Sequence, residues 1–489
     1  MGKVNPGRSE ARMKILLVKP KARLPTVLGL QRFQLLEPLE LGYLAAAAGP
    51  GHAVRVLDLR LCVAADLALV RTLQGFQPDL VGFTGYTHES SSVIRLSRLV
   101  RARLPRAVIV VGGHHATVEP ADFDLPSIDL IVRGEGCRPF STIVAALARG
   151  EIPSAIPGVL RTGEHYDPLA ASGWPSFPDP AELPTPRRDL WHPESYRSVW
   201  AAESMPPWSP LFPPVASVRT SFGCKMVCSF CIVPYLSGGQ HRTRPVESVV
   251  QEIAAAPADH IYFCDDENFI DESFAWELAE GLERAGVRKR YFAWTRSTTV
   301  NRSPELLKRW REIGLDAAFL GFEFPTDAEL KQASKGGNVA ANERALNRLR
   351  ALGIAVHAAF MVQPHYSHAE FDRLRRYVRA LPPSQSSFTV CTPSPGTPDY
   401  ARLQGDFWVA NPHDYHDCMH PLTPTSIPLP EFSRLFADQV RDGIARTPLR
   451  VARQPILPTD IWRLVRAEHA YYRGFRRIYR DYPRALWGG

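Results

Sequence analysis

The stretch that decides the fold is Gly223-Cys224-Lys225-Met226-Val227-Cys228-Ser229-Phe230-Cys231. Its cysteines are separated by three and then two residues, so one short loop can point all three thiolates at one centre. Three thiolates on a [4Fe–4S] cube leave one iron open to a small chelating molecule. Zinc is the alternative, but zinc needs a fourth ligand, and the nearest histidine, His241, lies ten residues beyond Cys231. The spacing favours a cluster and leaves zinc open.

The composition is that of a globular protein with two or three domains. The chain has 489 residues, of which 45% are hydrophobic and 22% charged, with a net charge of +8. No apolar run is long enough for a membrane span, and no apolar signal sequence follows Met1. Eight cysteines in such a chain favour a reducing, cytoplasmic location and a metal rather than disulfides. The basic excess could favour an anionic partner or a membrane surface, but it is modest for a chain of this size and is expected to be a solvated surface. No nucleic-acid module is visible.

Short apolar runs alternate with helical segments from residue 14 to residue 150. The expected strands are 15–18, 53–57, 80–84, 108–111 and 130–132, and the expected helices are 39–48, 65–75, 90–104 and 139–149. Five strands that alternate with helices predict a doubly wound, flavodoxin-like parallel sheet. No Gly-x-Gly-x-x-Gly opens the first helix, which argues against a dinucleotide.

Glycines and hydrogen-bonding residues follow three of these strands, at the edge where such sheets bind ligands. Glycine lets a large flat ligand approach the backbone, while Thr and His supply hydrogen bonds to its rim. Each loop alone is an ordinary turn, but together they predict a ligand site formed by Tyr86, Thr87, Gly112, Gly113, His114, Thr117, Gly134 and Glu135.

A proline-rich linker is expected over residues 151–214, densest at 175–186, either ordered and extended or partly disordered. The alternation then resumes over 215–400. The expected strands are 216–220, 260–264, 290–295, 317–321, 354–361 and 386–391, and the helices between them are near 246–255, 272–285, 304–313, 341–352 and 368–380. Six strands joined through helices predict a partial (β/α)6 barrel with its chemistry at the face that holds the cysteine loop. Residues 401–489 carry two helical patterns, 429–445 and 458–478, and are expected to be mainly helical.

Polar groups follow three further barrel strands. Consecutive acids stand at Asp265, Asp266 and Glu267, an arginine at Arg296 and an acid at Glu323. An arginine can clamp a carboxylate in two hydrogen bonds, and a glutamate can accept from a pair of ribose hydroxyls. Each alone is more often a solvated strand end or an ion pair. Around one rim with an iron–sulfur loop they predict a pocket for S-adenosylmethionine.

The order of motifs resembles two known families. The helix that starts Pro38-Leu39, the stretch from Gly51 to Asp58, and Gly-Gly-His-x-Ala-Thr at 112–117 resemble the cobalamin-binding domain that precedes many radical S-adenosylmethionine enzymes. An Asp-x-His-x-x-Gly motif is absent from the sequence, so the resemblance implies base-off cobalamin without a histidine on cobalt. His52 and Asp58 are expected to be structural.

The later motifs resemble the radical S-adenosylmethionine superfamily. Cys224, Cys228 and Cys231 match its cluster motif, and Phe230 matches its usual aromatic. The acids at 265–267 match its amino-group site and Glu323 its ribose-contacting acid. Many cobalamin-type members have Arg-Gly-Cys where this chain has Phe222-Gly223-Cys224, so no role passes to an arginine there.

The tail resembles the cobalamin-dependent radical enzymes that methylate C-3 of hopanoids, on Pro395-Gly396-Thr397, Asp414-Tyr415 and residues 428–432. This resemblance implies methyl transfer to an unactivated carbon of an apolar or secondary-metabolite substrate through a 5′-deoxyadenosyl radical and methylcobalamin. It also implies an electron donor of reductase or flavodoxin type. The alternatives are an oxidative cyclase like the anaerobic magnesium-protoporphyrin enzymes, and a non-catalytic cobalamin or metal carrier.

The last expected helix interleaves aromatic residues with arginines over 470–480. Such a helix can lie at lipid headgroups, which would put the protein at the inner membrane face, or it can pack on the barrel with its arginines in water. The second hypothesis is favoured. Cys264 and Cys391 are expected to be small core residues rather than radical quenchers.

Overall fold

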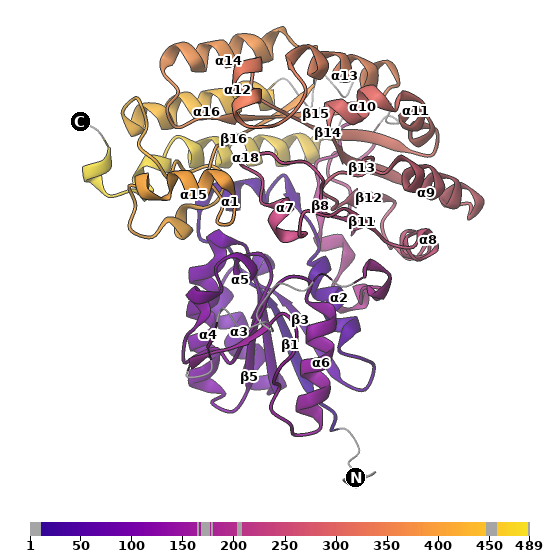
Figure 1. Cartoon of the computed structure of the whole chain (residues 1–489), viewed down its shortest axis with the longest axis vertical. Coiled ribbons are helices and arrows are strands. Elements are labelled where there is room, and N and C mark those ends of the chain that lie inside the picture. The colour runs from indigo at the N-terminus through magenta and orange to yellow at the C-terminus, as the bar shows by residue number, and fades with distance from the viewer. Residues whose placement is uncertain are drawn as a thin grey trace. The chain divides into compact units, whose positions relative to one another are not determined.

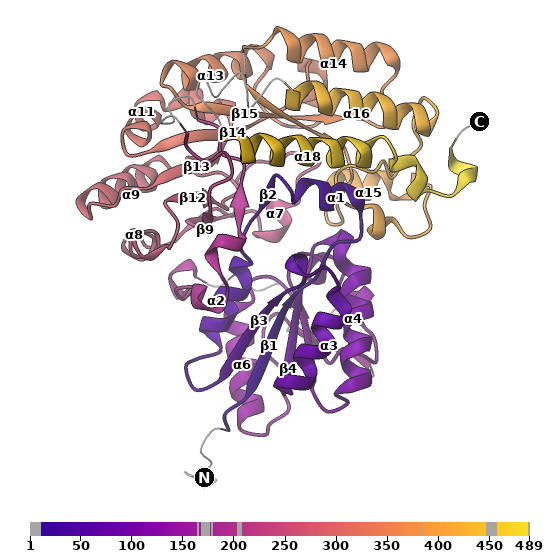
Figure 2. The same ribbon diagram turned by 180° about the vertical axis from the view of Figure 1, so that it is seen from behind.

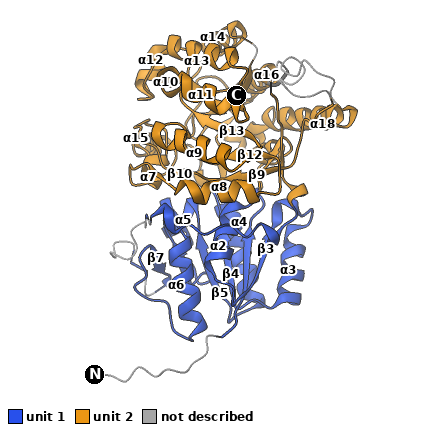
Figure 3. Cartoon of the chain, turned by 90° about the vertical axis from the view of Figure 1, so that its right-hand side faces the viewer, with its two compact units in different colours: residues 1–22, 38–192 blue, residues 23–37, 193–489 orange. Residues whose placement is uncertain are grey.

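The structure is a computed structural model that describes residues 11–163, 166–167, 177, 179–202, 208–382, 384–445 and 457–487. The chain forms two compact units (Figure 3). One comprises Met1–Ala22 and Pro38–His192, and the other comprises Arg23–Glu37 and Pro193–Gly489. None of the described helices is both long and apolar enough to cross a bilayer.

The first unit is built on one sheet. Its strands are β1 (Lys14–Lys19), β3 (Ala53–Asp58), β4 (Leu80–Thr84), β5 (Val108–Gly112), β6 (Leu130–Val132) and β7 (Val159–Arg161). They lie in the order β3-β1-β4-β5-β6-β7, and every pair is parallel except β6 with β7. The five parallel strands have the order of the flavodoxin-like fold, which confirms the predicted class.

Helices cover both faces of this sheet (Figure 2). On β1, Ile15 and Leu17 pack with α2 (Leu39–Ala47) and α6 (Cys137–Ala148). Leu16 and Val18 point the other way, toward α3 (Ala65–Phe76), α4 (Ser90–Arg103) and α5 (His114–Val118). Successive side chains on a strand face opposite sides, so a run of apolar residues is what a sheet covered on both faces requires.

The second unit contains the predicted partial barrel. Its parallel strands follow chain order: β9 (Val215–Val218), β12 (His260–Phe263), β13 (Arg290–Thr295), β14 (Leu315–Glu323), β15 (Ala355–Val362) and β16 (Gln385–Val390). The crossover helices are α8 (Val246–Ala255), α9 (Glu272–Arg284), α10 (Ser297–Arg302), α11 (Pro304–Glu312), α12 (Asp327–Gln332), α13 (Val339–Ala351) and α14 (His368–Ala380), several of which are labelled in Figure 1. The sheet stays open because β9 and β16 are its two edges.

The tail packs on the barrel's last strands. It contains α15 (Pro398–Leu403), α16 (Leu429–Ala445) and α18 (Pro458–Phe475). The buried face of α18 presents Leu464, Ala467, Tyr471 and Phe475. Tyr471 and Phe475 belong to the same hydrophobic core as α16, so this helix packs as the favoured hypothesis expects.

Two features of the structure differ from the expected organisation. Residues 23–37 belong to the second unit. There α1 (Pro25–Leu30) packs against α18, so closely that a Cβ on Gly29 would lie 3.0 Å from the Tyr471 ring. The expected linker contributes β7, an antiparallel edge strand, to the first sheet. Residues 168–174 of this linker, and 175, 176 and 178 of its proline-densest stretch, lie outside the described residues.

Candidate active site

The cysteine loop follows β10 (Ser221–Phe222), which pairs with β11 (Arg242–Thr243) in a two-stranded antiparallel ribbon. Gly223 has a φ of +86°, and a Cβ there would lie 2.0 Å from the carbonyl oxygen of Gln240. Only glycine fits this combination of positive φ and close backbone contact. The turn sends Cys224 and the rest of the loop out from the carboxyl edge of β9.

The first two predicted acids hold this loop in place. Asp265 is buried and accepts hydrogen bonds from both backbone and hydroxyl donors of Thr220 and Ser221, with Thr220 Oγ1 at 2.8 Å and Ser221 Oγ at 2.7 Å. Asp266 accepts from the Gly223 amide at 2.9 Å and pairs with Arg219 at 3.3 Å. These carboxylates therefore fix the backbone on which the cysteines stand.

Glu267 is placed differently. Its Oε1 accepts from Thr295 Oγ1 at 2.8 Å, while Oε2 is buried with no hydrogen-bond partner among the described residues. Burial raises the pKa of Glu267 to about 7, against the weaker opposing effects of the Thr295 hydroxyl, the nearby Phe269 amide and two arginines. A buried carboxylate oxygen without a donor is costly unless a ligand supplies one. Of the three acids, Glu267 is the one with capacity left for a ligand.

Arg296 faces the cysteine loop. It donates from Nη1 to Cys228 Sγ at 3.4 Å and from Nη2 to the Lys335 carbonyl, and its Nε is buried with no partner among the described residues. Burial raises the pKa of Cys224 and raises that of Cys231 to about 11. The free thiols are thus protonated near neutral pH, and a metal must displace their protons to bind.

The far end of the loop is held by an element whose role in the site the sequence did not indicate. Ser229 Oγ donates to Asp399 on α15 at 3.1 Å, and the Asp399 amide donates to the Ser229 carbonyl at 3.2 Å. Phe230 packs against a small cluster that contains Phe324 and Met361. The start of the tail therefore helps to position the cysteines.

Glu323 ends β14 in a strained conformation. Its φ is +63°, and the pairing with β15 shifts register between Gly321 and Glu323. The Glu323 carboxylate folds back to accept from Lys335, and a Cβ on Gly321 would lie 2.3 Å from Glu323 Oε1. Non-glycine residues in this region of φ cluster at ligand sites, because the surrounding structure must maintain them.

The predicted loops of the first unit bind to one another. Gly113 has a φ of +92°, and a Cβ there would lie 2.5 Å from Thr84 Oγ1. Thr117 Oγ1 donates to the Gly113 carbonyl at 2.8 Å and accepts from the Gly134 amide at 3.0 Å. Thr117 therefore joins the loops after β5 and β6. Gly112 is the last residue of β5, and Glu135 accepts weakly from the Cys137 amide at 3.4 Å.

Tyr86, Thr87 and His114 lie beside these loops. Tyr86 is 53% exposed, and its ring lies 5.7 Å from that of His114. Thr87 is buried, and its hydroxyl has no partner among the described residues. Lys19, which the sequence did not single out, is buried with its Nζ 4.9 Å from the Tyr86 ring centre. Burial opposes its charge, but Glu40 at 2.9 Å and Glu89 outweigh that cost and raise the pKa of Lys19.

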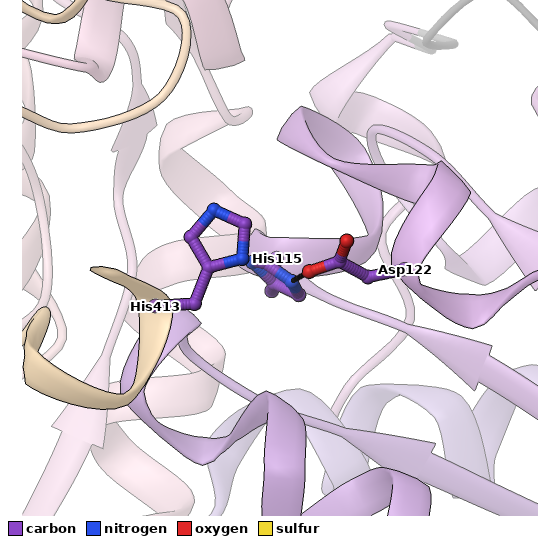
Figure 4. Close-up of side chains that lie close together, drawn as sticks. All are labelled: His115, Asp122 and His413. Atoms are coloured by element: carbon purple, nitrogen blue, oxygen red, sulfur yellow. Dashed lines mark hydrogen bonds and ion pairs between the residues drawn. The ribbon is translucent and has the colours of Figure 1, made fainter. Parts of the chain in front are cut away.

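The next histidine of this loop has a structural partner. His115 is buried, and its Nε2 lies 2.9 Å from Asp122 Oδ2 (Figure 4). His52 accepts from the Met13 amide at 3.2 Å, and Asp58 caps the turn through the Arg60 amide at 3.0 Å. These contacts give His52 and Asp58 the structural roles expected of them.

Comparison with known families follows the same division of the chain. The B12 binding domain family matches residues 25–144, and the Radical SAM superfamily matches residues 218–378. The hopanoid C-3 methylase of Methylococcus capsulatus is 30% identical over 427 residues, which cover 86% of this chain and 78% of that enzyme. The chain belongs to the cobalamin-dependent radical S-adenosylmethionine methyltransferase family. This finding rules out the zinc alternative for the cysteine loop.

One solved structure and one further curated protein are also similar to this chain. The radical S-adenosylmethionine methyltransferase TsrM from Kitasatospora setae, solved with cobalamin and a [4Fe–4S] cluster, has the same fold at a TM-score of 0.63. It is 18% identical, with 96% of this chain and 99% of that chain covered. The anaerobic magnesium-protoporphyrin IX monomethyl ester cyclase of Cereibacter sphaeroides is 27% identical over 84% of this chain and 64% of that enzyme.

Proposed function

We propose that this member of the family transfers a methyl group to an unactivated carbon of an apolar, triterpenoid-like substrate. The observation that carries the proposal is one edge of the barrel, where a three-cysteine loop, Arg296 and the unpartnered Oε2 of Glu267 come together. The substrate class rests on the similarity to hopanoid C-3 methylase.

Cys224, Cys228 and Cys231 would hold a [4Fe–4S] cluster, since one loop supplies all three thiols and leaves one iron open. When bound, the cluster and S-adenosylmethionine supply a 5′-deoxyadenosyl radical, and methylcobalamin supplies the methyl group. The protein's part is to exclude water and to fix the loop through Asp265, Asp266 and Asp399. Arg296 donates to the Cys228 sulfur and so helps to fix the position of that cysteine.

S-adenosylmethionine would bind along the same edge. Glu267 would accept from the ligand's amino group through its buried Oε2, and Glu323 would accept from the ribose hydroxyls. Arg296 has an unused Nε that can face the ligand's carboxylate, and Phe230 can contact its apolar parts. We assign Asp265 to the loop rather than to the ligand, because all its near donors belong to Thr220 and Ser221.

Cobalamin would bind at the carboxyl edge of the first unit's sheet, in its base-off form. Tyr86 and His114 offer rings, and the buried Thr87 hydroxyl offers a hydrogen bond that nothing described uses. Gly112, Gly113 and Gly134 carry no side chain, so a flat ligand could approach the backbone closely there.

Two partners complete the proposal. The chemistry needs an external one-electron donor of reductase or flavodoxin type. A peripheral contact of α18 with lipid headgroups would help to deliver an apolar substrate, and flotation of the protein with anionic vesicles tests it. Exposed Ile461, Trp462 and Val465 with neighbouring arginines are the part of α18 suited to such contact.

The test is anaerobic incubation of reconstituted protein with a strong reductant, methyl-labelled S-adenosylmethionine and a pentacyclic triterpene. We expect 5′-deoxyadenosine and labelled triterpene, both abolished when Cys224, Cys228 and Cys231 are replaced by Ala. 5′-Deoxyadenosine without label in the product would favour the cyclase-type oxidation of the other relatives. Failure to form 5′-deoxyadenosine would favour a non-catalytic carrier.

A further inference from the structure

The turn that follows α12 lies beside the cysteine loop, and its position is fixed by the end of the helix. α12 ends in a Schellman motif, in which the amide of Lys335 donates to the Leu330 carbonyl at 3.1 Å. Ser334 takes the left-handed conformation that this motif requires, with a φ of +50°. Lys335 is therefore held at a defined point after the helix.

The main chain of this turn holds the cysteine loop. The Ala333 carbonyl accepts from the Ser229 amide at 3.0 Å. The Lys335 carbonyl accepts from Arg296 Nη2, and the Cys228 sulfur lies 4.0 Å from the same oxygen. The turn thus contacts the loop at two neighbouring residues and also binds the arginine that faces it.

The side chain of Lys335 reaches the end of β14. Its Nζ pairs with Glu323 Oε1, and the two side chains are only 11% and 12% exposed. A Cβ on Gly321 would lie 2.6 Å from this Nζ, so the pair lies directly against the backbone of β14. Glu323 Oε2 has no hydrogen-bond partner among the described residues.

The charge balance of this pair favours a neutral partner for the free oxygen. A carboxylate that has lost most of its hydration needs a counter-charge, and Lys335 supplies it. What Oε2 still needs is a hydrogen-bond donor, and a hydroxyl is sufficient. S-adenosylmethionine also carries an ammonium and a sulfonium, which an unpaired carboxylate would attract. The lysine therefore makes Glu323 suited to the ribose rather than to the cationic end of the ligand.

We propose that Lys335 is a positioning residue for S-adenosylmethionine and acts through Glu323. Its ammonium fixes the carboxylate through Oε1 and leaves Oε2 for the ribose hydroxyls, while its carbonyl fixes Arg296 on the cluster side. One residue then sets the spacing between the cysteine loop and the acid that receives the nucleoside. The inference rests on the proposed function in placing the ribose at Glu323.

Equilibrium dialysis of the reconstituted holoenzyme, without reductant, tests the inference in the absence of turnover. The probes are radiolabelled S-adenosylmethionine and its 2′-deoxy analogue. We expect wild type to bind S-adenosylmethionine about tenfold more tightly than the analogue, because a hydrogen bond to a charged group is lost. Lys335→Met should weaken binding of S-adenosylmethionine about five- to tenfold and change that of the analogue little, so the preference disappears. Lys335→Arg should keep most of it.

A double-mutant cycle shows whether Lys335 acts through Glu323. Glu323→Gln alone should abolish the preference, and adding Lys335→Met to it should change neither affinity by more than about twofold. The matched control is Lys331→Met, an exposed lysine in the last turn of α12, which should leave both affinities as in wild type.

The inference is overturned if wild type binds both probes equally, or if Lys335→Met weakens both by the same factor. It is also overturned if Lys335→Met has its full effect in the Glu323→Gln background. The ratio of the two dissociation constants does not depend on how much protein carries a cluster, so partial cluster assembly in a variant leaves the comparison decisive. Methyl transfer is measured separately, so failure to label a triterpene would refute the proposed function and leave the role of Lys335 intact.

Discussion

Glu267 destabilises the ligand-free protein. Its raised pKa means that the folded state favours the protonated carboxyl. The associated stability is present below the ordinary pKa of 4.5 and is lost as pH rises through about 7. Glu267→Gln should therefore raise the unfolding midpoint of the apoprotein at pH 8 by several degrees, from roughly 3 kcal/mol, and change it little at pH 5.

The same substitution should impair function, because Gln cannot supply a second carboxylate oxygen to the ligand. We expect 5′-deoxyadenosine formation to fall at least tenfold while the apoprotein becomes more stable, a trade-off typical of ligand sites. Glu247→Gln on the exposed face of α8 is the control and should alter neither quantity. A destabilised Glu267→Gln, or one with full activity, would contradict this role.

The roles of single acids could not be predicted from sequence. Asp265, Asp266 and Glu267 are consecutive, and the sequence predicted one shared site for all three. The strand end turns them in different directions, so two bind the cysteine loop and one keeps an unpartnered oxygen. The cysteines were easier to assign, because their spacing along the chain alone brings them together.

At the scale of elements, the cysteine loop depends on the turn at Gly223. Gly223→Ala would push a methyl group into the Gln240 carbonyl and force an unfavourable φ, so the loop must move. We expect iron content after reconstitution to fall by more than half, as measured by iron and sulfide analysis. Gly239→Ala is a matched control, since Gly239 also has a positive φ, +70°, but has open space around it. Equal losses in both variants would show that φ strain, and not the contact with Gln240, determines cluster assembly.

The predicted strands and helices all appear, with bounds within a few residues, because apolar runs and amphipathic helices alternate so regularly. The sequence did not predict β7, since three residues inside a proline-rich stretch give no periodic signal. Nor did it predict that α1 packs with the tail. Its placement depends on Gly29 and Tyr471, which lie more than 400 residues apart, and such tertiary contacts leave no local pattern.

At the scale of the whole molecule, one buried charge cluster joins α1 to the segment after α18 within the second unit. His420 is buried, with Nδ1 2.9 Å from Asp417 and Nε2 3.1 Å from Asp481. Asp417 also accepts a hydrogen bond from the hydroxyl of Thr26, which is the second residue of α1. The cluster therefore links α1, the loop after α15 and the segment that follows α18.

The pH dependence of stability should reveal this cluster. Burial opposes the charge on His420, but Asp417 and Asp481 outweigh burial and raise the pKa of His420 to about 9. Burial also opposes the charge on Asp417, but His420 and the hydrogen bonds that Asp417 accepts outweigh burial and lower the pKa of Asp417 to about 2. The stability from His420 is full below its ordinary pKa of 6.5 and is lost as pH rises through about 9. That from Asp417 is present above 3.8 and is lost only as pH falls through about 2.

The unfolding midpoint of the apoprotein should thus fall between pH 6.5 and 9 in wild type, by the equivalent of roughly 3 kcal/mol. His420→Gln removes the charge, so its midpoint should lie well below wild type at pH 6 and approach it near pH 10. His368→Gln breaks a pair with Glu431 in which the histidine side chain is 57% exposed, and such surface pairs contribute under about 1 kcal/mol. Calorimetry of the three proteins across this range separates a buried ionic link from a surface one. If wild type and His420→Gln keep a constant difference from pH 6 to pH 10, His420 is neutral in the folded chain, and packing rather than charge holds the tail to α1.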